Sequence, residues 1–515
     1  MEPAKALGQY AHQRRKPEES VLYKIVQENL ETFLATVREE AGSPLPDFVA
    51  KEFYEYLRCG ILAHGFMRVQ CESCHKENLV AFSCKRRGFC PSRGGRRMSE
   101  TAIHLVDNVL PLKPIRQWVI SFPFQLRLLM AIRPKIMGDI LRITHECIAN
   151  HLRKKAGFAK TNAKVGAVTL IQRFGGSINL NVHFHQLFID GVYEVGADDE
   201  PTAFHTTGEP TRTEIAKILE KIISRVTKLL ERKGVIVKDP ETQGLQINLS
   251  GDVLGDDSFA KLQAGAISYR FAYGPNKGKK ALTLKTVPEQ DHNADHGLVA
   301  KNSGFSLHAG VAMPGTERDK IEKLCRYIAR PAIALERLKL TTGGQVVYSL
   351  KKPYSDGTTH IVMTQLELLE KIAAIIPRPK IHLTRYHGVL GPHYKHRKMV
   401  VPKQPLVNGV TQTKEQAEPT AKARITWARL LKRVFNIDVE ICAECGGKAK
   451  VIGAIEDPVV VRKILAHLGL PTKPPVILAA RSRGPPPSQS DDGYSQASME
   501  IPVEDQSQAP SFDFD

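Results

Sequence analysis

The chain has 515 residues, of which 42% are hydrophobic and 25% charged, and its formal net charge is +19. No apolar run approaches the ~20 residues of a membrane-spanning helix, and residues 1–20 lack a signal peptide's apolar stretch, so we expect a cytoplasmic, nucleoid-associated protein of two to four domains. The positive surplus lies in residues 1–470 and favours a polyanionic partner, because neutralising phosphates releases counterions.

Two helices are predicted over residues 20–58, where apolar residues recur at helical spacing on both sides of the turn "GSPLP". A cysteine cluster follows at 59–98, before a third helix at about 99–111. Four cysteines with the spacing C-x2-C-x9-C-x5-C can close a tetrahedral zinc site. They are Cys71, Cys74, Cys84 and Cys90, with Cys59, His64 and His75 as alternative ligands and reduced structural thiols as the alternative to a metal. Around them, "KRRGFCPSRGGRR" is expected to contact phosphates through Arg86 and Arg87.

From residue 112 the pattern becomes mixed α/β. A buried strand is predicted at 118–124 and a helix at 137–156. Residues 167–193 read as two strands joined by a Gly-Gly-Ser turn, and residues 211–234 form a strongly amphipathic helix.

Two histidines, His183 and His185, occupy same-facing positions of the second strand of this hairpin. If the hairpin turns at about 175–179, Gln172 lies opposite His183, and an amide oxygen converges with two imidazoles on one sheet face. Such a donor set suits Mg²⁺ or Mn²⁺ with open coordination positions, as in a nuclease site. The alternative is that both are ordinary strand histidines bonded to their neighbours.

The next helix is predicted over residues 317–330 and ends before Pro331. Tyr327 lies off its apolar face and shares a side with Lys323 and Arg330. A tyrosine flanked by cations can attack a phosphodiester, because positive charge favours the phenolate form and steadies the phosphate. The alternative is a tyrosine packed at the helix edge. The apolar face itself comprises Ile321, Leu324, Cys325 and Ile328.

Residues 346–400 look strand-rich with basic insertions, and they contain a rival nucleophile, Tyr386, in a loop that we expect to contact DNA. Residues 424–470 hold a helix, a CxxC motif and a closing helix. The motif, formed by Cys442 and Cys445, is half of a zinc site: either a distant histidine completes it, or the metal has been lost. Beyond 470 the chain is acidic and rich in Pro, Ser and Gln, so disorder is predicted.

The "VHFH" strand, with "TLIQRFGGSINLN" before it and "GFSLHAGVA" and "LCRYIARPAIA" after it, resembles the IS-91-type rolling-circle insertion-sequence transposases. This family belongs to the His-hydrophobic-His single-strand nucleases, as do plasmid replication initiators and relaxases. The segments "FYEYLRCGILAHGF", "AFSCKRRGFCPS", "DGTTH", "RYHGVLGPHYKHR" and "WARLLKRVFNIDVEICAECGG" are also similar to the family, in its order. Only the region beyond about 470 is unmatched.

The resemblance implies that His183 and His185 bind the divalent metal that polarises the scissile phosphate, with Gln172 as the third ligand. Tyr327 matches the nucleophile, which cuts one strand of single-stranded DNA and leaves a 5′-phosphotyrosine and a free 3′-hydroxyl. Strand transfer then reverses this step without ATP. Many members carry two tyrosines one helical turn apart, but Lys323 occupies the earlier position, so the chain resembles the single-tyrosine branch. Their zinc motif commonly ends in C-P-x-C, whereas Arg93 replaces the last cysteine here.

We therefore expect an α+β multidomain protein. An N-terminal helical zinc-binding domain (1–111) precedes a catalytic domain with a central antiparallel sheet flanked by helices (112–345). A basic DNA-contacting region with a partial zinc ribbon (346–470) and a disordered acidic tail (471–515) follow. The expected function is metal-dependent nicking and strand transfer of single-stranded DNA at element termini and target sites. A non-catalytic zinc-dependent DNA-binding protein, or a replication initiator or relaxase, is the alternative. The expected DNA contacts are Lys323, Arg326, Arg330, Arg86 and Arg87.

Overall fold

The structure is a computed structural model. It describes residues 16–84, 86–238, 245–247, 257–287, 297–402, 441–442 and 444–481. The helix predicted to precede the CxxC motif, and most of the predicted acidic tail, lie outside the described residues. Among the helices of the described part, none is long and apolar enough to cross a membrane.

The N-terminal helices form as predicted. Helix α1 (Val21–Ala41) begins where the Ser20 hydroxyl accepts a hydrogen bond from the Tyr23 amide, and it ends at Gly42, whose φ of 72° suits a glycine. Helix α2 (Asp47–Arg58) packs against α1 through aromatic side chains. Residues far along the chain, in α10 (Gln365–Ile375), cover another side of α1, so the N-terminal helices and the C-terminal region share one core.

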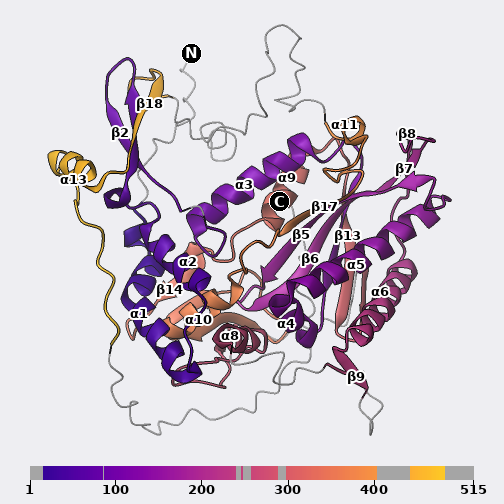
Figure 1. The fold of residues 1–515 in the computed structure, drawn as a ribbon, viewed down its shortest axis with the longest axis horizontal. Coiled ribbons are helices and arrows are strands. Elements are labelled where there is room, and N and C mark those ends of the chain that lie inside the picture. Colours follow the sequence, from indigo (N-terminus) through magenta and orange to yellow (C-terminus); the bar gives the residue numbers. More distant parts are fainter. Residues whose placement is uncertain are drawn as a thin grey trace.

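A six-stranded, fully antiparallel sheet lies at the centre of the molecule (Figure 1), in agreement with the predicted central sheet. Its strands, in spatial order, are β12 (Val299–Asn302), β13 (Phe305–Met313), β3 (Ile115–Ser121), β6 (Leu180–Ile189), β5 (Gly166–Phe174) and β17 (Thr384–Gly388). The helices around it are α3 (Pro91–Asn108), α4 (Phe124–Ile132), α5 (Pro134–Lys155), α8 (Ser258–Ile267) and α9 (Arg318–Ile328).

The two faces of the sheet are buried against different helices. Phe184 and Phe188 point from β6 into a core that also contains side chains of α4, α5 and α8. Leu187 and Ile189, which alternate with them, point to the opposite face and pack with side chains of α3 and α9. The histidine pair of β6 has the same parity as Leu187, so it faces α3 and α9.

A second antiparallel sheet is built from both ends of the chain. Strand β1 (Phe66–Cys71) pairs with β2 (Glu77–Ala81) on one side and with β18 (Ala449–Ile455) on the other. Helix α13 (Pro458–His467) packs Val461 and Leu465 against Leu62 and Phe66. The CxxC segment is therefore part of the N-terminal zinc-binding unit in space rather than a separate partial ribbon.

Two further segments depart from the expected domain layout. Strand β17 lies beyond residue 345, yet it forms an edge strand of the central sheet by pairing with β5. Residues 471–481, which were expected to be disordered, run along α1: the Gln27 side chain donates to the Val476 carbonyl, and the Arg481 amide donates to the Thr32 hydroxyl.

The remaining elements surround the central sheet and the N-terminal helices. They include β4 (Ala163–Lys164), β7 (Gly191–Val195), β8 (Pro201–Thr206), α6 (Arg212–Arg232), β9 (Ile236–Lys238), β10 (Leu245–Ile247), β11 (Leu282–Lys285), β14 (Leu338–Leu340), β15 (Val346–Ser349), β16 (Thr358–Met363) and α11 (Arg397–Val400).

On the α5 side of the sheet, three flat rings stack in a row. The His145 ring lies between those of Phe188 and His387, with centroid distances of 5.4 and 4.3 Å and nearly parallel planes. Burial lowers the pKa of His145 to about 3 and that of His387 to about 4. Both imidazoles are therefore neutral at pH 7.

This stack predicts acid sensitivity. Between pH 6.5 and 4 the unfolded chain binds protons that the folded chain does not, so the free energy of unfolding falls as the pH falls. Each histidine adds a slope of about 1.4 kcal/mol per pH unit in this window. Urea unfolding at pH 7, 6, 5 and 4.5 gives the free energy of unfolding at each pH. This free energy should depend less steeply on pH in His145→Phe than in the wild type, whereas exposed His393→Phe should show the wild-type pH dependence. An unchanged slope in His145→Phe would contradict this.

Candidate functional site

The two histidines of β6 converge as the alternation predicted. Their Nε2 atoms lie 3.1 Å apart, and the side chains are almost fully buried. Gln172 of β5 is paired directly with His183, which confirms the predicted hairpin register. The three side chains therefore share the sheet face beneath α3 and α9.

The hydrogen bonds of His183 place the lone pair of its imidazole on Nε2, which accepts from His185 Nε2 over 3.1 Å. Its Nδ1 lies 3.0 Å from the Asn181 carbonyl, and a carbonyl can only accept, so Nδ1 carries the proton. Burial, above all, lowers the pKa of His183 to about 4, and the pKa of His185 also falls well below its usual value. Neutral imidazole is the form that binds metal, and here the His183 Nε2 lone pair faces the Nε2–H of His185, whose proton would have to move to Nδ1 for both nitrogens to become ligands.

Gln117 of β3 belongs to the same cluster, although nothing in the sequence singled it out. Its Nε2 lies 2.6 Å from His185 Nδ1, and its Oε1 is buried without a hydrogen-bond partner among the described residues. A metal at His185 Nε2 requires a proton on Nδ1, and a rotated Gln117 amide would accept that proton through Oε1. The orphaned oxygen thus fits a divalent cation at the histidine pair.

His308 of β13 was also missed by the sequence prediction. It pairs with Val119 of β3, which in turn pairs with His185, so both histidines lie in one row on one face. Its buried Nδ1 has no hydrogen-bond partner within the described part of the chain. In the sequence, His308 lies in the segment "GFSLHAGVA", which resembles the transposase family. The pairing of β13 with β3, which brings it beside His185, could not be predicted from local alternation.

Gln172 links the histidine pair to the tyrosine helix. Its Nε2 donates to the Ile328 carbonyl over 3.2 Å, at the C-terminal end of α9. The apolar face predicted for this helix is buried, as expected, and its neighbour Tyr327 is half-buried. Tyr327 therefore sits one residue from a group that touches the proposed metal ligand.

Cations surround the Tyr327 ring. The Arg330 guanidinium lies 4.3 Å from the ring centroid and also donates to the Tyr327 carbonyl, while Lys351 Nζ lies 4.7 Å from the same centroid. Arg330 was predicted from helical spacing, but Lys351 comes from the segment after β15 and was not. Lys323 is exposed on the helix, and Arg326 pairs with Glu322 at 3.8 Å.

The basic start of α3 lies beside this tyrosine segment. A Cβ added at Gly94 would lie 2.6 Å from Pro331 Cβ, so only glycine allows this approach. Burial, followed by the charges of Arg87 and Arg93, lowers the pKa of Arg97, which shows that these arginines cluster. Arg87 also donates to the Ile381 carbonyl, whereas Arg86 is half-buried beside it.

The cysteines form two groups rather than the predicted one. Cys71 and Cys74 meet Cys442 and Cys445, while Cys84 and Cys90 lie with Cys59. The predicted set of Cys71, Cys74, Cys84 and Cys90 is thus divided between two sites. The physical reason is the pairing of β1 with β18, which brings the second CxxC to the first.

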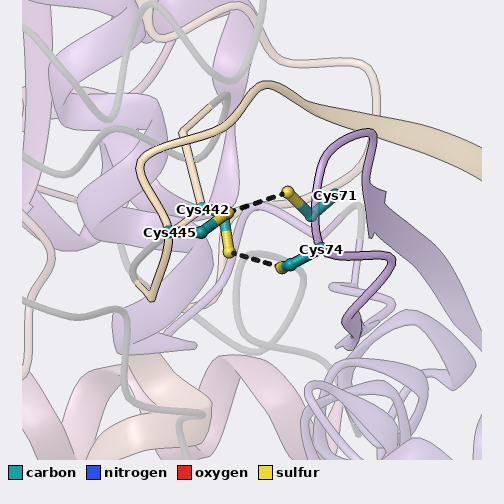
Figure 2. A group of neighbouring side chains, drawn as sticks. All are labelled: Cys71, Cys74, Cys442 and Cys445. Atoms are coloured by element: carbon teal, nitrogen blue, oxygen red, sulfur yellow. Dashed lines mark hydrogen bonds between the residues drawn. The ribbon is translucent and has the colours of Figure 1, made fainter.

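The four-cysteine group has the dimensions of a structural zinc site (Figure 2). Its sulfur atoms lie within 4.8 Å of one another, and the Cys71–Cys445 and Cys74–Cys442 sulfur distances are 3.4 and 3.7 Å. A tetrahedral zinc with bonds of about 2.3 Å places its thiolates about 3.8 Å apart. Backbone amides of Cys74 and Cys445 lower the pKa of Cys71 and Cys442, respectively, which favours the thiolate form.

The second group contains three buried cysteines. The Cys90 and Cys59 sulfurs are 3.6 Å apart, and the Cys84 amide donates to the Cys59 sulfur. A side-chain hydrogen bond with Cys59 raises the pKa of Cys84 to about 12, and a similar hydrogen bond raises the pKa of Cys90. Among the described residues no His, Cys, Asp or Glu completes a fourth position, consistent with Arg93 in place of the last cysteine.

Two family models match the chain. Residues 166–398 match the model described as Putative transposase, which spans β5 to the start of α11, and residues 25–122 match the Transposase zinc-binding domain of the IS91 type. No curated protein and no solved structure matches the chain. The first match contains the histidine pair and Tyr327, and the second contains both Cys71 and Cys90. The chain is thus similar to a transposase zinc-binding domain over residues 25–122 and to a transposase domain over residues 166–398, and the two matches together support a DNA transposase of the IS91 type.

Proposed function

We propose that this transposase nicks single-stranded DNA in a metal-dependent reaction and transfers the strand through a 5′-phosphotyrosine at Tyr327, as in rolling-circle transposition. The observation that carries the proposal is the bond from Gln172 to the Ile328 carbonyl, because it joins the histidine pair to the residue next to the tyrosine. A metal-binding triad and a nucleophile on one face are the parts that such a reaction needs.

The side chains have distinct roles in this proposal. His183, His185 and Gln172 would hold Mg²⁺ or Mn²⁺, which when bound would polarise the scissile phosphate. The Tyr327 oxygen gives up its phenolic proton to solvent and forms a bond to phosphorus as the bond to the 3′ oxygen breaks, and the departing 3′ oxygen takes up a proton from solvent. Arg330 and Lys351 offset the phosphate charge beside the ring. A rotated Gln117 amide would hold the proton of His185 on Nδ1 when metal is bound at Nε2.

The DNA path would follow the basic residues beside Tyr327. Lys323 lies on α9 and Arg330 two residues beyond its end, and the start of α3 approaches the next residue, Pro331, at Gly94. We assign phosphate contacts to Arg86, Arg87 and Arg326 as well. Because Lys323 lies one turn before Tyr327, the chain is assigned to the single-tyrosine branch.

A structural role for zinc accompanies this function. The zinc-binding domain and the cysteine groups support structural Zn²⁺. We propose Cys71, Cys74, Cys442 and Cys445 as the ligands of one ion, and Cys59, Cys84 and Cys90 as three ligands of a second. The first ion would fix β18 on β1, and the second would fix the segment that leads into α3.

The decisive test is a covalent adduct. Full-length protein is incubated with 3′-labelled single-stranded DNA spanning the element termini, with Mg²⁺ or Mn²⁺ or without metal. We expect a denaturant-stable labelled adduct only with metal, and trypsin should place the nucleotide on peptide 327–337 rather than on peptide 386–395. His183→Ala should lower the adduct yield by about 100-fold, and exposed His393→Ala should not. No adduct with either metal would refute the proposal and favour a non-catalytic DNA-binding protein.

A further inference from the structure

A cavity of about 480 Å³ lies on the opposite side of the central sheet from the histidine pair, between α5 and the edge strand β17. His387 pairs with Ala167, and Ala167 pairs with Phe188, so this row points to the α5 face. The volume of the cavity falls within the range of about 300–1,000 Å³ that is usual for small-ligand sites. The cavity takes no part in the proposed nicking reaction.

Helix α5 supplies two thirds of the lining residues. Gly138, Arg142, His145, Ala149 and Arg153 recur at intervals of three or four residues, so they form a single stripe. His387 faces this stripe from β17, whereas the neighbouring Tyr386 packs on the opposite face of the sheet. The lining therefore combines flat rings with cations.

The charge of the cavity is positive. Its carboxylate, Glu146, is already bound by Arg142 and Arg225. Arg153, Lys160 and Arg385 also line it, and none of them has a carboxylate within ion-pair distance among the described residues. An anion entering here meets three cations that no described carboxylate offsets.

The rings complete a nucleotide-like recognition pattern. The stacked His145 and His387 both line the cavity, and His145 Nε2 is buried without a hydrogen-bond partner in the described part of the chain. A nucleobase offers a flat surface and polar edge atoms, and its phosphate offers the negative charge. Proteins that bind single strands combine such rings with a positive groove.

We propose that the α5–β17 cavity binds one nucleotide of a DNA single strand, as a second subsite remote from Tyr327. The phosphate lies among Arg153, Lys160 and Arg385, and the base lies beside the His387 ring with a polar edge atom toward His145 Nε2. This inference rests on the proposed function only in that the chain binds single-stranded DNA. A free mononucleotide has the same chemistry and is distinguished by the test.

Gly138 offers a substitution that leaves the fold intact. It lies in α5, and a Cβ added there meets no heavy atom within 4 Å, so Gly138→Ala is accommodated and favours the helix. Gly138→Glu places a carboxylate at the cavity wall. Gly138→Ala is the matched control, and exposed Lys217→Ala is the control for Lys160→Ala.

The experiment uses full-length Tyr327→Phe protein, so that no cleavage intervenes, and a 20-nucleotide single strand containing 5-iododeoxyuridine. We expect Gly138→Glu to weaken binding of the strand by about tenfold. Lys160→Ala should make the slope of log affinity against log salt concentration shallower, by the amount expected for about one lost phosphate contact. Photo-crosslinks should fall on peptides of 142–153 or 385–387 and disappear in Gly138→Glu.

Unchanged affinity in Gly138→Glu together with crosslinks elsewhere would overturn the subsite. Competition by millimolar deoxynucleoside monophosphate alone, without strand crosslinks, would assign the cavity to free nucleotides and would also overturn it. The covalent adduct assay on the Tyr327 protein is separate: crosslinks in the cavity without any adduct would refute the nicking proposal and leave the subsite standing.

Discussion

Replacing Tyr327 with phenylalanine is expected to abolish the covalent DNA adduct, with a loss of nicking of at least about 10³-fold, because the variant has no oxygen to bond to phosphorus. The ring remains, so its packing against Arg330 and Lys351 is kept. Affinity for single-stranded DNA should therefore change by no more than about twofold. Gel analysis of the labelled adduct and fluorescence anisotropy measure the two quantities.

Tyr386→Phe is the matched control, because it removes a hydroxyl from the rival tyrosine. This residue lies on β17, packed beside the core beneath α3 and α9, and burial raises its pKa. We expect the adduct yield to stay within twofold of the wild type. If the adduct survives in Tyr327→Phe and is lost in Tyr386→Phe, the assignment of the nucleophile is wrong.

Removing one ligand of the four-cysteine group is expected to release zinc and loosen the sheet that joins the chain ends. Structural zinc binds zinc-finger peptides with about 10–16 kcal/mol, so Cys445→Ser should lose one zinc equivalent per chain. Hydrogen exchange should then accelerate in β18 and β1, whose pairing the metal would hold, and not in β6. A strong chelator should reproduce both effects in the wild type.

Cys147→Ser is the control for this variant. Cys147 is a buried thiol of α5 and belongs to neither cysteine group. Its zinc content and the exchange rates in β18 should equal those of the wild type. Zinc content that stays constant in Cys445→Ser, with β18 still protected, would show that these four cysteines do not hold a metal.

The parts of the site that depend on local alternation were predictable. The register of β5 with β6 follows from a short turn and a period of two, so the sequence alone predicts that Gln172 lies opposite His183. The buried face of α9 followed from a period of 3.6, which also placed Arg330 beside Tyr327.

The parts that depend on contacts distant in sequence were not predictable. Cys71 and Cys445 are 374 residues apart, and no local pattern indicates that β18 pairs with β1. Likewise, Lys351 contacts Tyr327 from the segment after β15, and Gln117 reaches His185 through the pairing of β3 with β6. A CxxC motif supplies two of the four thiolates of a zinc site but does not indicate which cysteines supply the other two. The spacing along the chain therefore favours Cys84 and Cys90 as partners of Cys71 and Cys74.

The pairing of the first and last strands has a consequence for synthesis of the protein. About 370 residues separate Cys74 from Cys442, so at 5–20 residues per second the ribosome needs roughly 20–70 s to deliver the second half of the four-cysteine site. During that interval Cys71 and Cys74 are two thiols of an incomplete site on the nascent chain. A polypeptide whose translation stops before residue 442 retains the histidine pair and Tyr327 but has no β18 with which to close its zinc-binding sheet.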